Sequence, residues 1–152
     1  MRTKVVAPGL LAVGVIALGI VSGCGNEGTA DAAGLQTSSP RKIAAGDVAV
    51  TLGQGKEFSV AVAPQGTAGK IDFVVRNAGA LDHEFVVVRT DEAAPDLGTD
   101  EADEAGAVDE IQDLPAGATK LLSVTLPAGH YVLLCNLPGH YVGGMYADFT
   151  VK

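Results

Sequence analysis

Short alternating segments separated by turns fill residues 46–152, and this pattern constrains the fold more than any other feature of the chain. Apolar residues alternate with smaller or polar ones, as in strands that bury one face. Turns rich in Gly, Pro and Asn separate these segments. The seven predicted strands cover residues 48–52, 58–62, 70–77, 83–90, 119–126, 130–135 and 145–151. Strands of this number and spacing predict an all-β domain, either a Greek-key β-sandwich or a barrel.

The segment from residue 91 to residue 113 departs from the pattern, because it is too long for a hairpin loop. It holds ten acidic residues and no basic one. We predict a long acidic loop with a short helix near residues 99–107, capped by Thr99 or Asp100. Two interpretations of the charge stay open. The loop steers a basic partner toward the protein, or it is a solvated segment that keeps the protein soluble.

The amino-terminal residues have the order of a secretory signal. Arg2 and Lys4 precede an apolar stretch, and small residues lead to Cys24. The run Val-Ser-Gly-Cys resembles a bacterial lipoprotein lipobox, in which the cysteine is acylated and becomes the first mature residue. The resemblance implies a signal peptide over residues 1–23 and a lipid anchor at Cys24, so that the protein is extracytoplasmic and anchored to a bacterial membrane. An uncleaved membrane anchor is the alternative.

The next residues, 24–45, are rich in Gly, Ala, Thr and Ser, with Pro40 among them and no apolar periodicity. This composition predicts a flexible tether. The chain thus divides into a signal peptide, an acylated cysteine with its tether, and one folded domain over residues 46–152.

Charge and composition exclude nucleic acid as a partner. The formal net charge is −8 at pH 7, which opposes binding to a phosphate backbone. Only 5% of the residues are aromatic and none is Trp, so a platform for stacking bases is not expected.

Three residues able to bind a metal lie in the loop between the last two predicted strands. Four residues separate Cys135 from His140, and four more separate His140 from Met145. Cys135 ends one predicted strand and Met145 starts the next, and period-two alternation points both side chains inward. If these strands are neighbours, the two side chains lie close together. Gly and Pro turns before His140 and before Met145 can direct these residues to the same end of the domain.

His83 is the candidate for a fourth ligand, because it opens a predicted strand and the chain has only three histidines. His130 is predicted to be exposed on the face opposite Cys135. Two imidazoles, a thiolate and a thioether suit a copper ion that alternates between Cu(II) and Cu(I), whereas zinc rarely takes a thioether. The alternative is that a buried cysteine, a surface histidine and a core methionine occur here independently.

On these residues, the segment 46–152 resembles the cupredoxins, small blue-copper electron-transfer proteins. The ligand loop is most similar to that of the rusticyanin and auracyanin branch of the family, and plastocyanin has a shorter one. The resemblance implies one mononuclear type 1 copper held by His83, Cys135 and His140, with Met145 as the weak axial ligand. It also implies a one-electron carrier without substrate turnover, which exchanges electrons with redox partner proteins and has no catalytic residue.

One residue departs from the family pattern. Many members have Asn or Ser directly after the first histidine, where the side chain ties two ligand loops together. Here the residue is Glu84. We expect it to keep the backbone amide that supports the cysteine sulfur and to lose the side-chain tie, which affects how the surroundings tune the metal.

The residues around His140 suggest a docking surface. Leu137, Pro138, Tyr141 and Val142 are predicted to form an apolar rim where a redox partner binds. The alternative is that they only pack the loop.

Other function classes fit the chain less well. A copper enzyme with a second metal centre needs further histidines, which the chain does not supply. A copper storage or delivery lipoprotein, the alternative function, commonly uses exposed clusters of Met or Cys, and beyond Met1 the only methionine is Met145. We therefore favour a membrane-tethered electron carrier with no small-molecule substrate.

Overall fold

The computed structural model describes residues 42–152. The predicted signal peptide, the predicted lipidation site Cys24 and nearly all of the predicted tether lie outside the described residues. Within residues 42–152, no helix is long and apolar enough to cross a membrane.

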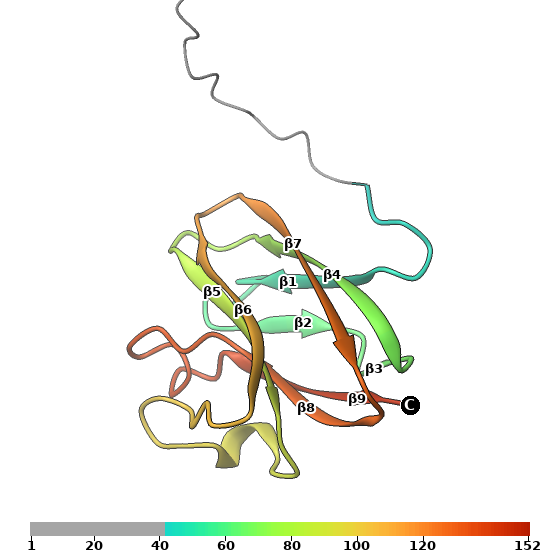
Figure 1. Ribbon diagram of the computed structural model, residues 1–152. Helices are drawn as coiled ribbons and strands as arrows, with labels where there is room; N and C mark the ends of the chain where they lie inside the picture. Colours follow the sequence, from blue (N-terminus) through green and yellow to red (C-terminus); the bar gives the residue numbers. More distant parts are fainter. Residues whose placement is uncertain (1–41) are drawn as a thin grey trace, which may run out of the picture. The chain divides into compact units, whose positions relative to one another are not determined.

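The described residues form two sheets packed face to face (Figure 1). The four-stranded sheet has the order β2-β1-β4-β7, and the five-stranded sheet has the order β3-β9-β8-β5-β6. Most pairings are antiparallel, whereas β1 pairs with β4 and β3 with β9 in parallel. The strands are β1 (Val48–Leu52), β2 (Val60–Val62), β3 (Gln65–Gly66), β4 (Gly69–Asn77), β5 (His83–Arg89), β6 (Ala107–Leu114), β7 (Thr119–Leu126), β8 (Gly129–Leu134) and β9 (Tyr146–Val151). The prediction of an all-β sandwich is confirmed.

The main core fills the space between the sheets. Phe73 from β4 contacts Phe85 from β5 and Phe149 from β9, with ring centroids 5.5 Å apart in both pairs. All three rings are fully buried. Cys135 and Met145 belong to the same buried cluster, so the inward orientation predicted for both side chains is confirmed.

A second apolar layer covers the outer face of the five-stranded sheet. Val86 and Val88 of β5 point to this side, together with Val132 and Leu134 of β8. The acidic segment packs on them through three apolar side chains, Ala94, Leu97 and Ala102. Both faces of β5 and β8 are therefore buried, which explains their nearly continuous apolar sequences.

The prediction for the acidic segment was wrong in its details. A short 3₁₀ helix, η1 (Ala94–Asp96), lies ahead of the predicted helical position, and residues 99–107 form no helix. The end of the segment forms strand β6, where acidic side chains point to solvent and Ile111 and Leu114 are buried. Register shifts in the pairing of β5 with β6 interrupt the alternation that would have revealed this strand. The two-residue strand β3 falls within a predicted turn.

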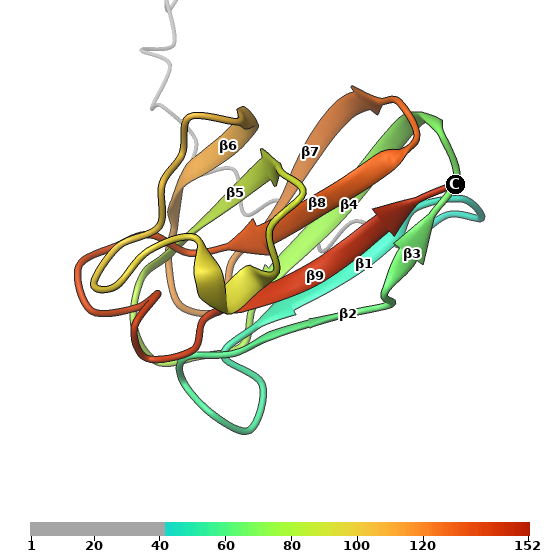
Figure 2. The same cartoon turned by 90° about the horizontal axis from the view of Figure 1, so that it is seen from below.

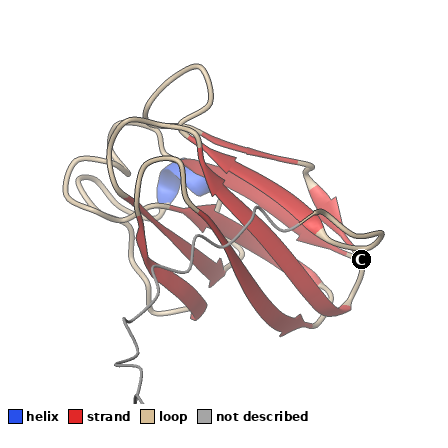
Figure 3. Ribbon diagram, turned by 90° about the horizontal axis from the view of Figure 1, so that it is seen from above, coloured by secondary structure: helices blue, strands red, loops and turns tan. Residues whose placement is uncertain are grey.

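The loops that matter for the site gather at one end of the sandwich. The loop between β8 and β9 and the acidic segment lie at the end opposite the carboxyl terminus (Figure 2). Figure 3 shows the short helix and long loops at the end of the sandwich away from the carboxyl terminus. The sheets thus provide a rigid base, and this end of the domain carries the candidate site.

Candidate metal centre

The pairing of three strands brings the four predicted ligands to the same end of the domain. His83 is the first residue of β5, Cys135 directly follows β8, and Met145 directly precedes β9. Strand β8 lies between β5 and β9 and is hydrogen-bonded to both. His140 lies in the loop that joins β8 to β9.

Three of these side chains form one compact group. Cys135 Sγ lies 3.2 Å from His140 Nδ1, and His140 Nδ1 lies 3.2 Å from His83 Nδ1. The three potential ligand atoms all lie within 4.8 Å of one another. His83 and Cys135 are fully buried, and His140 is 9% exposed. Both histidines therefore turn the same ring nitrogen, Nδ1, toward the sulfur.

Met145 joins the group through the backbone. The Cys135 amide donates a hydrogen bond to the Met145 carbonyl at 3.0 Å, and the Met145 amide donates to the His140 carbonyl at 3.1 Å. The Met145 side chain is fully buried in the core cluster that also contains Cys135. Met145 is therefore tied by its backbone to Cys135 and to His140, and its side chain is buried in the core near them.

Burial controls the protonation of the group. It lowers the pKa of His140, and it lowers the pKa of His83 with a smaller contribution from the neighbouring His140. Both imidazoles are thus neutral near pH 7 and able to bind a metal. Burial raises the pKa of the Cys135 thiol, which the backbone amides of Glu84 and Leu137 partly oppose. A metal that binds here must therefore displace the thiol proton.

Comparison with solved structures identifies the fold. No protein-family model matches the chain, and no curated protein matches it. Reduced rusticyanin is similar, with a TM-score of 0.56 and 20% identity over 70% of this chain and 78% of that chain. Reduced auracyanin from Roseiflexus castenholzii gives a TM-score of 0.51 and 24% identity over 70% of this chain and 94% of that chain. The chain has the cupredoxin fold.

The donor set of the group fits one type 1 copper. His83, Cys135 and His140 supply two imidazole nitrogens and one sulfur, and the buried Met145, bonded through its backbone to Cys135 and His140, offers a thioether nearby. Two histidines and a cysteine with a weak methionine ligand are typical of blue-copper sites. A structural zinc site would have four strong ligands, and the described part of the chain brings only three such residues together here.

Glu84 corrects a prediction about the surroundings of the site. Its backbone amide approaches Cys135 Sγ at 3.4 Å, as expected. Its side chain was expected to leave the two ligand loops untied, but Glu84 Oε1 accepts a 2.7 Å hydrogen bond from the Asn136 amide. The longer glutamate side chain reaches the residue after Cys135 and forms the tie with a carboxylate.

Asn136 extends this tie to the acidic segment. Its side-chain oxygen accepts from the Ala102 amide at 2.7 Å, and its side-chain nitrogen donates to the Ala102 carbonyl and to Glu104. Asn136, the residue after Cys135, is therefore held by Glu84 through its backbone and by the acidic segment through its side chain. The acidic segment is an ordered part of the surroundings of the site.

Two variants of Glu84 separate the hydrogen bond from the charge. Glu84→Ala removes the acceptor of the Asn136 amide, and we expect the free energy of unfolding to fall by about 1–3 kcal/mol. Glu84→Gln keeps an oxygen acceptor. Burial, and then repulsion from nearby glutamates, raises the pKa of Glu84, so the uncharged glutamine should be at least as stable as the wild type at pH 7. Urea unfolding of the copper-free variants measures both effects, and equal destabilisation by Gln and Ala would contradict this account.

The predicted apolar rim is only partly exposed. Val142 is 59% exposed and Pro138 is also exposed, whereas Leu137 is half-buried against the core. Tyr141 is buried, because its ring packs in the outer layer and its hydroxyl donates to the Ala94 carbonyl and accepts from the Leu97 amide. Tyr141 therefore holds the acidic segment and is not available at a docking surface.

His130 lies away from the site, on β8. Its Nδ1 lies 2.9 Å from the Thr90 carbonyl oxygen and its Nε2 lies 3.0 Å from Asp148 Oδ1. Its ring is partly covered by these partners. His130 is thus a structural residue and takes no part in the metal site.

The sequence did not reveal two residues that contact the histidines. Glu57 and Phe58, in the loop between β1 and β2, reach His83 and His140 respectively. Glu57 Oε1 lies 3.1 Å from His83 Nε2, and the Phe58 ring lies 4.8 Å from the His140 ring between centroids. The turn before β2 was recognised, but no local pattern shows which distant side chain a loop residue contacts.

Proposed function

We propose that this protein is an extracytoplasmic one-electron carrier that uses a single type 1 copper and is tethered by lipid to a bacterial membrane. The observation that carries the proposal is the buried group of His83 Nδ1, His140 Nδ1 and Cys135 Sγ. Copper bound there supplies a Cu(II)/Cu(I) couple that gains and loses one electron. The proposed activity requires no catalytic residue and no small-molecule substrate.

The protein side chains suit both oxidation states of copper and limit the structural rearrangement between them. The soft thiolate of Cys135 favours Cu(I), the two imidazoles accommodate Cu(II), and the thioether of Met145 adds only a weak donor. Strand ends and backbone hydrogen bonds hold these side chains in place. A donor set fixed by the fold keeps small the rearrangement that accompanies each electron transfer, which is the property a carrier needs.

We place the docking surface for redox partners around His140. It is the only one of the three strong ligands with measurable exposure, and exposed Pro138 and Val142 lie in the same loop. Leu137 contributes its exposed part. The acidic segment, held next to Cys135 through Asn136, gives a basic partner a favourable approach. These features support a protein partner of positive charge.

Titration with copper tests the function. We expect Cu(II) added to the purified protein at one equivalent to produce an intense visible band from the bond between copper and the Cys135 thiolate. Ascorbate should bleach the band, and a mild oxidant should restore it over repeated cycles. Absence of the band, or tight zinc binding in preference to copper, would overturn the proposal.

Copper storage or delivery is the alternative function, and the burial of the ligands disfavours it. Proteins that exchange copper with partners need donor atoms that a partner can reach, whereas Cys135 and His83 are fully buried. Rapid transfer of copper from the loaded protein to a small chelator would favour delivery. Retention of copper through redox cycling would favour the carrier.

The membrane tether has its own test. Cys24→Ser removes the thiol that the proposed lipid modification requires. We expect the wild type to fractionate with membranes and the variant to be released, or to remain as an unprocessed precursor of higher mass. Mass spectrometry of the wild type should show an acylated amino-terminal Cys24. Membrane retention of an unacylated Cys24→Ser protein would favour an uncleaved anchor.

A further inference from the structure

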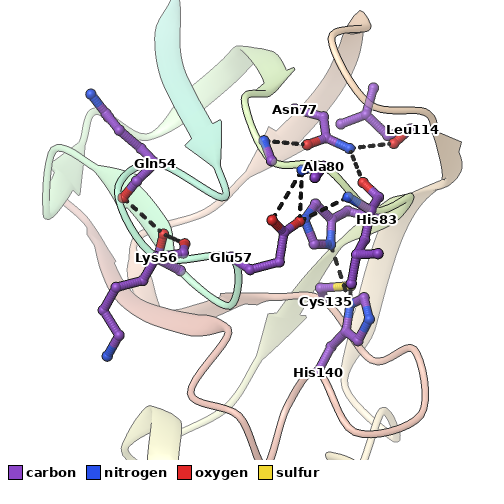
Figure 4. A network of polar contacts seen from close by, with 12 residues as sticks. Gln54, Lys56, Glu57, Asn77, Ala80, His83, Leu114, Cys135 and His140 are labelled. Atoms are coloured by element: carbon purple, nitrogen blue, oxygen red, sulfur yellow. Dashed lines mark hydrogen bonds and ion pairs between the residues drawn. The ribbon is translucent and has the colours of Figure 1, made fainter.

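The loop between β1 and β2 contributes a carboxylate to the metal centre. Glu57 Oε1 lies 3.1 Å from His83 Nε2, the ring nitrogen that faces away from the other ligands. The same carboxylate accepts hydrogen bonds from the Ala80 amide at 3.0 Å and from the Leu81 amide at 2.9 Å (Figure 4). Three donors therefore converge on one side chain.

We propose that Glu57 is a positioning residue of the copper site, which fixes the orientation and tautomer of His83 and stabilises Cu(II) relative to Cu(I) by its charge. This inference rests on the proposed function for its redox part. The positioning role concerns the His83 ring itself and does not depend on which metal binds.

The tautomer follows from the partners of the two ring nitrogens. An ionised carboxylate only accepts hydrogen bonds, so the proton of a neutral His83 lies on Nε2. The lone pair of Nδ1 then points toward His140 and Cys135, where a metal would bind. The amides of Ala80 and Leu81 donate to the Glu57 carboxylate, and hydrogen bonds of this kind favour its charged form. A carboxylate paired with the second nitrogen of a histidine ligand commonly sets ring orientation and ligand basicity.

The backbone around Glu57 is shaped to accept it. A Cβ atom at Gly79 would collide with the Glu57 carboxylate and lie 3.0 Å from His83 Nε2. A Cβ atom at Gly53, which has a φ of 70°, would lie 2.6 Å from Gly79 Cα. Gly79 thus leaves the space in which the carboxylate meets the ring, and Gly53 allows the backbone of its own loop to approach Gly79.

The charge of Glu57 acts on the metal through His83. A negative charge near a site favours the more highly charged ion, so Cu(II) gains more than Cu(I). The neighbouring Phe58 packs on the ring of His140, the other histidine of the group. One loop therefore contacts both imidazoles, and Glu57 supplies its charged contact.

Two variants separate the charge from the hydrogen bond. Glu57→Gln keeps an oxygen that can accept from His83 and removes the charge, and we expect a higher reduction potential with the His83 tautomer unchanged. Glu57→Ala removes both, and we expect a higher potential together with a loss of Cu(II) affinity of about 10–100-fold. Glu92→Gln is the matched control, because it removes the same charge at an exposed position after the far end of β5.

The measurements are potentiometry, competition with a Cu(II) chelator, and ¹⁵N NMR of the His83 ring in the copper-free protein. A single Nε2–H tautomer in the wild type that is lost in Glu57→Ala supports the positioning role, even if copper gives no blue site and the proposed function fails. The inference is overturned if the ring is unaffected in Glu57→Ala, or if neither Glu57 variant changes the potential more than Glu92→Gln does. If Glu57→Ala does not fold, the potential of Glu57→Gln decides.

Discussion

Cys135→Ser should abolish the intense visible band of the copper-loaded protein and leave the β-sandwich folded. The thiolate supplies both the charge-transfer absorption and the strongest bond of a blue-copper site, and a serine hydroxyl stays protonated and binds copper weakly. Serine has a similar shape and can accept the hydrogen bond from the Glu84 amide that now reaches Sγ at 3.4 Å. The loss of stability should therefore stay below about 3 kcal/mol.

Visible absorption after copper addition tests this expectation, with circular dichroism and urea unfolding of the copper-free variant as controls for the fold. Full colour in Cys135→Ser would mean that another residue provides the sulfur or that the site is elsewhere. A variant that loses its strand signal would say nothing about copper, and the milder Cys135→Ala would then decide between these cases.

Met145→Leu should raise the reduction potential and leave copper bound. The side chain is fully buried in the core cluster, and leucine has nearly the same volume, so the change in stability should be under about 1.5 kcal/mol. The exchange removes a weak donor that helps Cu(II) more than Cu(I). We expect at least a tenfold change in the ratio of the two affinities, which corresponds to ~59 mV for one electron.

Met145→Gln is the matched opposite, since an amide oxygen is a harder donor than a thioether and should lower the potential. Potentiometry with visible spectra on both variants measures the two shifts. Loss of copper from Met145→Leu, or a lower potential in that variant, would mean that Met145 is not a weak axial ligand.

The grouping of the candidate ligands was predictable because their signals are local. The spacing of Cys135, His140 and Met145 lies within one loop, and strand alternation is enough to orient the ends of that loop. His83 could be chosen because few histidines compete with it and because it opens a strand. The same alternation predicted the sandwich, since strands with one buried face need a second sheet.

The contacts around the ligands depend on distant residues, and the sequence could not supply them. Glu57 meets His83 across 26 positions of the chain, and Glu84 meets Asn136 across 52. The family pattern has the shorter Asn or Ser at the position of Glu84, so the comparison did not show that a glutamate side chain reaches Asn136. The burial of Tyr141 follows from the second apolar layer, and that layer was missed because the many acidic side chains obscured the few apolar ones that pack on the sheet.

The position of β9 makes the metal-binding group depend on closure of the sheet. Strand β9 lies between β3 and β8 in the interior of its sheet, and the residue before it is Met145. The loop that carries His140 is therefore held by β8 at one end and by β9 at the other. A chain in which β9 has not paired cannot hold Met145 beside Cys135, and a chain in which β5 has not paired with β8 cannot bring His83 to Cys135. The group of ligands is thus a marker of completed folding, because it assembles only when the five-stranded sheet is closed.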